Sequence, residues 1–330
     1  MGRKAKSRTD ERPSAVKRKR AKYRVTNWKS YNASLVARGS LTIWLSAEAL
    51  ASWTPQVEGR RRRGGQMRYS EQAIECLLTL RAVLSLPLRA MEGFGQSVLH
   101  LLGASERMPD YTTLCKRSRG LKVCIPIAAR TGPLHVVIDS TGLKIYGEGE
   151  WKVRKFGYGK HRTWRKLHLC VNPDTHQIEA ATLTVLAGQD AQAGSQMLDS
   201  LHHPIDFVAG DGAYDKLSFY QTCQRLHIPF QAVPPRRDAT IIQHGNCAGP
   251  SLSRDQNLRA IRRSTRRAWK RRSGYHRRSL AEVAVFRFKT IFGGQLQART
   301  FDRQLSEALI KCKALNMMTR LGMPVSQLIA

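Results

Sequence analysis

Four polar side chains recur at spacings that suit one face of a helix: Tyr275, Arg278, Glu282 and Lys289. Their offsets of 3, 7 and 14 residues from Tyr275 bring them to one side at about 100° per residue. Apolar residues in the same segment indicate that it also packs: Leu280, Val283, Phe286 and Phe288. A solvated helix surface could carry the same stripe, but we interpret it as facing a metal ion and a DNA backbone.

Two aspartates follow short apolar runs. Leu134 to Ile138 precedes Asp139-Ser-Thr-Gly, and Asp206 to Gly210 precedes Asp211, so we expect two strands that each stop at an acid. Acids at strand ends lie at the sheet edge where open α/β sheets bind ligands. If the strands are neighbours, the carboxylates face each other and need a cation, for which Mg²⁺ is suited. Taken alone, each aspartate is better explained as a turn or helix-cap residue than as a metal ligand.

The elements around these acids predict an α/β domain over residues 131–330. Strands at 167–171 and 178–185 flank the turn sequence Asn172-Pro-Asp-Thr, which indicates a hairpin. Helices are expected at 190–201 and 216–226, a strand at 230–233, and a late helix after a basic insertion at about 236–273. This order matches a ribonuclease H-like domain, a mixed sheet flanked by helices.

Residues 26–130 read as a small helical DNA-binding domain. Ser70 caps a helix with Glu71 in its first turn, and a second helix is expected from Arg89 to Leu102. Asp110 then precedes a short helix whose exposed side would carry its DNA-binding groups: Thr112, Thr113, Lys116 and Arg117. A helix-turn-helix-like unit would dock such a helix in a major groove. An ordinary helical bundle with a basic face is the alternative.

The charge balance indicates an anionic partner. Lys and Arg number 56 against 24 Asp and Glu, a net charge of +32, which favours nucleic acid. No run approaches the ~20 apolar residues of a membrane span, so no membrane partner is expected. The seven cysteines are scattered without a close metal-binding pair, and no apolar segment follows the basic N-terminus. Both observations predict a cytoplasmic protein.

Several basic segments have no assigned element. Residues 1–25 are expected to be a disordered arm along phosphates or a solvated tail, and Arg60 to Gly65 an exposed loop. Between Arg236 and Arg278 there are thirteen Arg or Lys and two acids, which predicts a DNA clamp or a disordered loop. The prominent pairs there are Arg262-Arg263 and Arg266-Arg267. The stretch 152–166, interleaved with aromatics, would grip DNA or form an exposed β-ribbon.

Together these motifs resemble the DDE transposases of the insertion sequence five and four families. The resemblance rests on Asp139-Ser-Thr-Gly, Asp211-Gly-Ala-Tyr-Asp and the spacing from Tyr275 to Lys289. It extends to the Asn27 to Trp44 segment, to Asp110-Tyr-Thr-Thr-Leu, and to the segment from Glu307 to Asn316. Most of the chain is therefore covered.

The resemblance implies a catalytic triad of Asp139, Asp211 and Glu282 that holds two divalent ions, Mg²⁺ or Mn²⁺. It also implies that Arg278 and Lys289 contact phosphates and that Tyr275 positions the DNA end. The expected partners are double-stranded DNA at terminal inverted repeats, target DNA, and a second copy of the chain in the complex. The protein would be bacterial and nucleoid-associated. A catalytically silent DNA-binding descendant acting as a repressor and a nuclease of the same fold are the alternatives.

Overall fold

The computed structural model describes residues 22–45, 47–55, 67–126, 132–145, 164–185, 189–244 and 251–329. Three predicted basic segments lie wholly or largely outside this part of the chain: the arm up to residue 21, the run at 60–65 and the stretch at 152–163. Among the helices of the described ranges, none is long and apolar enough to cross a membrane.

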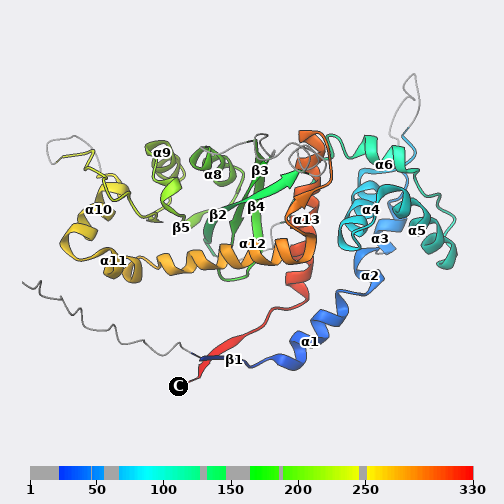
Figure 1. The fold of residues 1–330 in the computed structure, drawn as a ribbon, viewed down its shortest axis with the longest axis horizontal. Coiled ribbons are helices and arrows are strands. Elements are labelled where there is room, and N and C mark those ends of the chain that lie inside the picture. The colour runs from blue at the N-terminus through cyan, green and yellow to red at the C-terminus, as the bar shows by residue number, and fades with distance from the viewer. Residues whose placement is uncertain are drawn as a thin grey trace, which may run out of the picture.

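A mixed β-sheet forms the centre of the protein (Figure 1). Its strands are β2 (Leu134–Ile145), β3 (Trp164–Val171), β4 (Ile178–Thr184), β5 (Ile205–Ala209), β6 (Phe230–Ala232) and β7 (Gln295–Leu296). They lie side by side as β4-β3-β2-β5-β6, with β7 beside the end of β2. β2, β3 and β4 are antiparallel, whereas β5 and β6 continue parallel to β2. This arrangement confirms the predicted ribonuclease H-like fold.

Alternate residues of β2 serve the two faces of the sheet. Leu134, Val136 and Ile138 are buried against one pair of helices, α8 (Asp190–Asp199) and α9 (Leu217–Arg225). Val137 and Leu143 are buried on the other face, which α12 (Ser279–Phe292) and α13 (Phe301–Leu321) cover. Because side chains alternate along a strand, Asp139 belongs to the face of α12 and Ser140 to the face of α8.

The predicted turns and caps are confirmed by their hydrogen bonds. Asn172 accepts from the backbone N–H groups two and three residues later, at 2.8 and 3.2 Å. Ser70 Oγ accepts from the Ala73 N–H at 3.0 Å. Asp110 caps the next helix through two backbone N–H groups, at 2.8 and 2.9 Å. Each cap satisfies a donor that a helix start or a turn leaves free.

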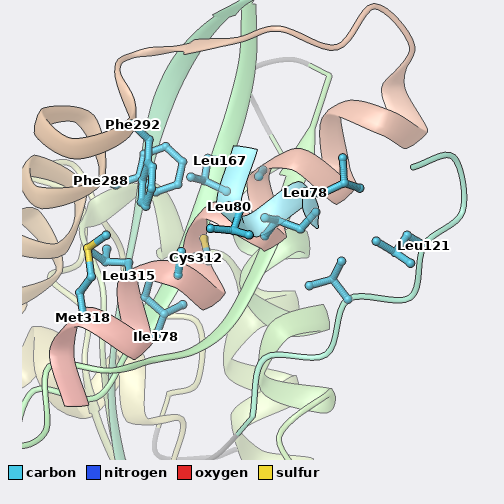
Figure 2. Packing of buried hydrophobic residues seen from close by; sticks show 14 of the residues in the cluster. Leu78, Leu80, Leu121, Leu167, Ile178, Phe288, Phe292, Cys312, Leu315 and Met318 are labelled. Carbon is cyan, nitrogen blue, oxygen red and sulfur yellow. The ribbon is translucent and has the colours of Figure 1, made fainter. Parts of the chain in front are cut away.

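The N-terminal helices share a core with the central sheet. They are α1 (Trp28–Ala37), α2 (Leu41–Trp44), α3 (Ala47–Ala51), α4 (Glu71–Val83), α5 (Leu88–Leu101) and α6 (Tyr111–Arg117). Leu78 and Leu80 of α4 belong to the same buried cluster as Phe288 of α12 and Leu315 of α13 (Figure 2). The core is therefore continuous across residue 130, and the division into two domains stays a prediction.

Polar residues of α13 explain the closing motif of the sequence. Lys313 forms an ion pair with Glu75 of α4, so α13 holds the N-terminal helices. Asn316 pairs with the backbone of Ile178 in β4, accepting its N–H at 2.8 Å and donating to its carbonyl at 2.7 Å. α13 thus fastens both the helical unit and the edge of the sheet.

Two predicted irregular segments are ordered. Within the expected arm, β1 (Lys22–Val25) pairs antiparallel with β8 (Ser326–Ile329), visible at the lower edge of Figure 1. That part of the arm prediction is wrong because a strand some 300 residues later satisfies its backbone. In the basic insertion, α10 (Ser253–Arg263) and α11 (Arg266–Arg272) are helices, which excludes a disordered loop for those residues.

Candidate active site

Asp139 lies inside β2 rather than at its end. The strand continues to Ile145, because β3 pairs with it from Val137 through Lys144. The prediction of a turn directly after Asp139 is therefore wrong. On its other side, β2 pairs with β5 only as far as Val137 and Ala209. Asp139 therefore lies just beyond the point where the pairing with β5 ends.

Asp211 lies beside Asp139 at this edge. Two residues beyond the pair Val137 and Ala209, a parallel register brings the aspartates level on adjacent chains. Asp211 Oδ1 accepts the Ala213 N–H at 2.9 Å and caps a 3₁₀ turn, η1 (Gly212–Tyr214). Gly210 is required there, since a Cβ would lie 2.8 Å from the Tyr214 ring.

Glu282 is supplied by the first turn of α12. The preceding residues form a separate 3₁₀ turn, η2 (Tyr275–Arg278), after Gly274 with φ 67°. The prediction of one α-helix through all four polar residues is therefore wrong: Tyr275 and Arg278 belong to η2, and Arg278 is the N-cap of α12. Arg278 remains in contact with Glu282 as an i, i+4 ion pair, and the Tyr275 ring lies 5.8 Å from the Arg278 guanidinium carbon.

Lys289 is the outlying member of the predicted stripe. It is exposed in the last turn of α12, seven residues and therefore about 10 Å along the helix from Glu282. Val283 and Phe286 on the same helix are exposed, at 41% and 69%, whereas Phe288 is buried. Only some of the apolar residues that were expected to pack in this segment are therefore buried.

Electrostatic coupling links the three acids. Burial raises the pKa of Asp139; its bond from the Ser140 N–H and the nearby Arg278 charge oppose that rise, while Asp211 and Glu282 add to it. Arg278 Nη1 lies 3.7 Å from Asp139 Oδ2 and pairs with Glu282 through Nη2. Arg278 thus bridges two of the three carboxylates and supplies the positive charge that such a group needs.

The donors suit a hard divalent cation, although the side chains are not arranged around one. Three carboxylates offer the oxygen ligands that Mg²⁺ prefers. Within the described ranges, however, no three His, Cys, Asp or Glu side chains are close enough to hold a metal. Arg278 occupies the place between Asp139 and Glu282. Since the Glu282 side chain is 54% exposed, it is free to turn towards Asp139 once Arg278 moves away.

A polar cluster behind the acids escaped prediction. Lys166 and Asp190 form an ion pair at 2.7 Å, and Ser140 Oγ donates to Asp190 at 3.3 Å. His168 is fully buried beside them, and its Nε2 hydrogen-bonds with Thr184 Oγ1 at 2.9 Å. The sequence of β3 does not indicate which side chains its polar residues contact. Lys166, expected to bind DNA, instead forms an ion pair with Asp190.

The His168 environment predicts a loss of stability in acid. Burial lowers its pKa from 6.5 to about 4, with Asp190 opposing and Lys166 adding to the shift. The unfolded chain therefore binds more protons in this window, and the free energy of unfolding falls by up to about 3 kcal/mol as the pH drops through it. His168→Gln should flatten urea-measured stability between pH 6.5 and 4. A variant with the wild-type slope would assign the effect to other groups.

Asp215 anchors the basic insertion beside the acids. Its buried carboxylate accepts the Arg254 Nε at 2.9 Å and the Arg236 N–H at 3.0 Å. Asp255, also buried, accepts the backbone N–H groups of Ile242 and Gln243. Asp215 belongs to the motif Asp211-Gly-Ala-Tyr-Asp, but the motif does not indicate its role, because its partners lie 21 and 39 residues away in the chain.

A basic groove extends from the insertion to Arg278. It is lined by Arg266, Arg267, Lys270, Arg271, Tyr275, His276, Arg278 and Ser279. Lys270 Nζ lies 4.7 Å from the centre of the Tyr275 ring. Figure 1 shows α11 running into α12 at one end of the molecule. The four predicted arginines are divided: Arg266 and Arg267 line this groove, whereas Arg262 and Arg263 belong to the end of α10.

The predicted residues of α6 have structural partners. The hydroxyls of Thr112 and Thr113 both donate to Asp110, at 2.5 and 3.0 Å. Arg117 donates to the Tyr69 carbonyl at 3.0 Å. Lys116 is exposed. A DNA-reading role for the four stays a prediction, with Lys116 the most accessible of them.

The central mixed sheet, with Asp139 and Asp211 side by side on adjacent chain segments, defines a ribonuclease H-like domain. Two models of known families match the chain, both described as a transposase DDE domain, over residues 36–148 and residues 115–317. The second spans more than half of the chain, and the chain belongs to the DDE transposase family. It is accordingly a metal-dependent enzyme that cleaves DNA and transfers strands. Asp139 lies in both matched ranges, and Asp211 and Glu282 in the second.

Proposed function

We propose that the protein is the transposase of a bacterial insertion sequence of the five or four type, acting at terminal inverted repeats. The observation that carries this is the contact of Arg278, a lining residue of the basic groove, with Asp139 and Glu282, while the charges of Asp211 and Glu282 act on Asp139. Acids serve DNA cleavage only where the phosphate can approach them. The groove provides that approach, since its cations suit a DNA backbone.

Asp139, Asp211 and Glu282 would hold two divalent ions, Mg²⁺ or Mn²⁺. When bound, the ions supply activation of water or a 3′-hydroxyl and stabilisation of the leaving oxygen. Asp139 and Asp211 are fixed by the sheet and by backbone N–H bonds, so they are oriented in advance. Glu282 is the adjustable member, because its side chain is half exposed.

Arg278 would change partners as DNA binds. In the structure it pairs with Asp139 and Glu282. Once these acids bind divalent ions, its guanidinium would be free to turn towards the groove. There it would bind a phosphate, for which a planar guanidinium is well shaped. Tyr275 would order the Arg278 side chain through their ring contact, and exposed Lys289 would contact the backbone further along.

The wider assembly follows from the same proposal. The 26–130 unit would read the repeat, with Lys116, Thr112, Thr113 and Arg117 on its DNA side. Arg262, Arg263, Arg266 and Arg267 would bind backbone without reading sequence. A homodimer would hold two transposon ends and the target DNA, near the nucleoid in the cytoplasm.

Cleavage of end DNA by the purified full chain tests the proposal. Linear DNA carrying the element's end should be cut at the repeat boundary with Mg²⁺ or Mn²⁺, and not with EDTA. A duplex of the same composition but scrambled repeat is the control. Binding without cleavage in any metal would indicate a silent repressor-like descendant. Equal cleavage of both duplexes would indicate a nuclease of the same fold.

A further inference from the structure

A cavity of about 360 Å³ lies where the N-terminal helices meet the catalytic domain. Leu78 and Phe292, both labelled in Figure 2, give it an apolar side. Ser118, the C-cap of α6, and Ser306 of α13 add hydroxyl groups. Ligand pockets begin at about this size, and this one is remote from the groove of α11, with which it shares no lining residue.

Positive charge outweighs negative charge in this cavity. Arg81, Arg299 and Arg303 line it, and none of them forms an ion pair with an acid of the described ranges. Glu307 also lines it, but that carboxylate is engaged by Lys311 at 2.7 Å and by the N–H groups of Gln297 and Ala298. Three guanidiniums and the Lys311 ammonium therefore line one space with a single carboxylate, Glu307, whose charge also acts on Arg81.

Two of the guanidiniums have buried donors without partners. The Nε atoms of Arg81 and Arg303 are inaccessible to solvent and make no hydrogen bond within the described chain. One terminal nitrogen of Arg81 donates a hydrogen bond to the Gln297 side chain, and burial lowers the pKa of Arg81. An unpaired buried donor is costly, and a buried charge more so. A bound anion would offset both costs.

We propose that this cavity binds a phosphate-bearing small molecule, up to the size of a mononucleotide. Arg81 and Arg303 would donate to its phosphate oxygens, with Arg299 adding charge at the loop before α13. A guanidinium matches phosphate bidentately, and Leu78 and Phe292 would receive an apolar or base-like portion. Because Arg81 belongs to α4 and Arg303 to α13, the bound anion would tie the N-terminal helices to the catalytic domain.

Thermal unfolding of the full chain tests this site. Inorganic phosphate and a nucleoside 5′-monophosphate are titrated against chloride at equal ionic strength. We expect Tm to rise by about 2–5 °C at a hundredfold excess over Kd. Arg303→Gln should weaken binding about tenfold or more, and Arg299→Gln serves if that variant does not fold. Arg119→Gln, a side chain 70% exposed and paired with Asp302 outside the cavity, is the matched control.

The outcomes separate the sources of phosphate. Additive stabilisation by the monophosphate and by end DNA indicates a free ligand. If DNA abolishes the response and Arg303→Gln weakens DNA binding, a backbone phosphate fills the cavity instead. No phosphate effect beyond chloride, or an equal effect in Arg303→Gln, overturns the proposal and leaves a cavity filled by water. The proposed active site is unaffected by either result, since metal-dependent cleavage is measured separately.

Discussion

Replacing Asp139 with asparagine is expected to slow cleavage of end DNA by at least about a thousandfold while DNA binding stays within a few-fold of wild type. The isosteric change keeps the side-chain shape and removes the charge with which the proposed site would hold divalent ions, and losing those ions would raise the barrier by several kcal/mol. Asp211→Asn and Glu282→Gln should behave alike. Single-turnover cleavage in Mg²⁺ and binding in Ca²⁺ measure the two properties.

Two controls distinguish lost chemistry from lost folding. Asp199→Asn removes an acid that pairs with Arg225 away from the site and should cleave normally. Asp139→Asn should leave the metal-free protein at least as stable at neutral pH. The pKa of Asp139 is raised, so its ionised form lowers stability above that pKa. Cleavage at the wild-type rate by any of the three variants would remove that acid from the triad.

Neutralising Arg267 and Arg271 together is expected to weaken DNA binding about tenfold to a hundredfold at low salt. Both side chains are exposed and line the groove that leads to Arg278. Each lost phosphate contact should reduce the slope of log K against log salt by about 0.9, so the double glutamine variant loses about 1.8. Fluorescence anisotropy over a salt series measures both quantities.

The matched control is Lys216→Gln with Arg225→Gln. This pair removes the same charge from the α9 region, which covers the opposite face of the sheet. It should change the affinity only through the net charge and leave the slope almost unaltered. Equal losses in the two double variants would show that general attraction, rather than the α11 groove, binds the DNA.

Local signals in the sequence predicted much of the fold. Ser70, Asp110 and Asn172 were identified as caps and turns because each satisfies backbone donors within three residues of itself. The order of strands and helices predicted the sheet. A metal site at Asp139 and Asp211 requires that their strands be neighbours, and the parallel pairing of β2 with β5 meets this condition.

The remaining features depend on partners far away in the chain. β2 continues beyond Asp139 because β3 still pairs with it there. β1 forms because β8 completes its hydrogen bonds. The predicted polar stripe required one uninterrupted α-helix, but Tyr275 to Arg278 form the separate 3₁₀ turn η2. No spacing rule could have shown that Arg278 bridges Asp139 and Glu282, since that contact requires the strand and the helix to be placed first.

The shared core has a consequence for how the protein is made. Leu78 and Leu80 pack against residues of α13, more than 200 positions later in the chain. Contacts of such separation form only after the intervening chain has been synthesised. The N-terminal helices must therefore leave the ribosome with part of their apolar surface uncovered and wait for α13. A gene shortened before α13 would lose the packing of its first helices as well as its last.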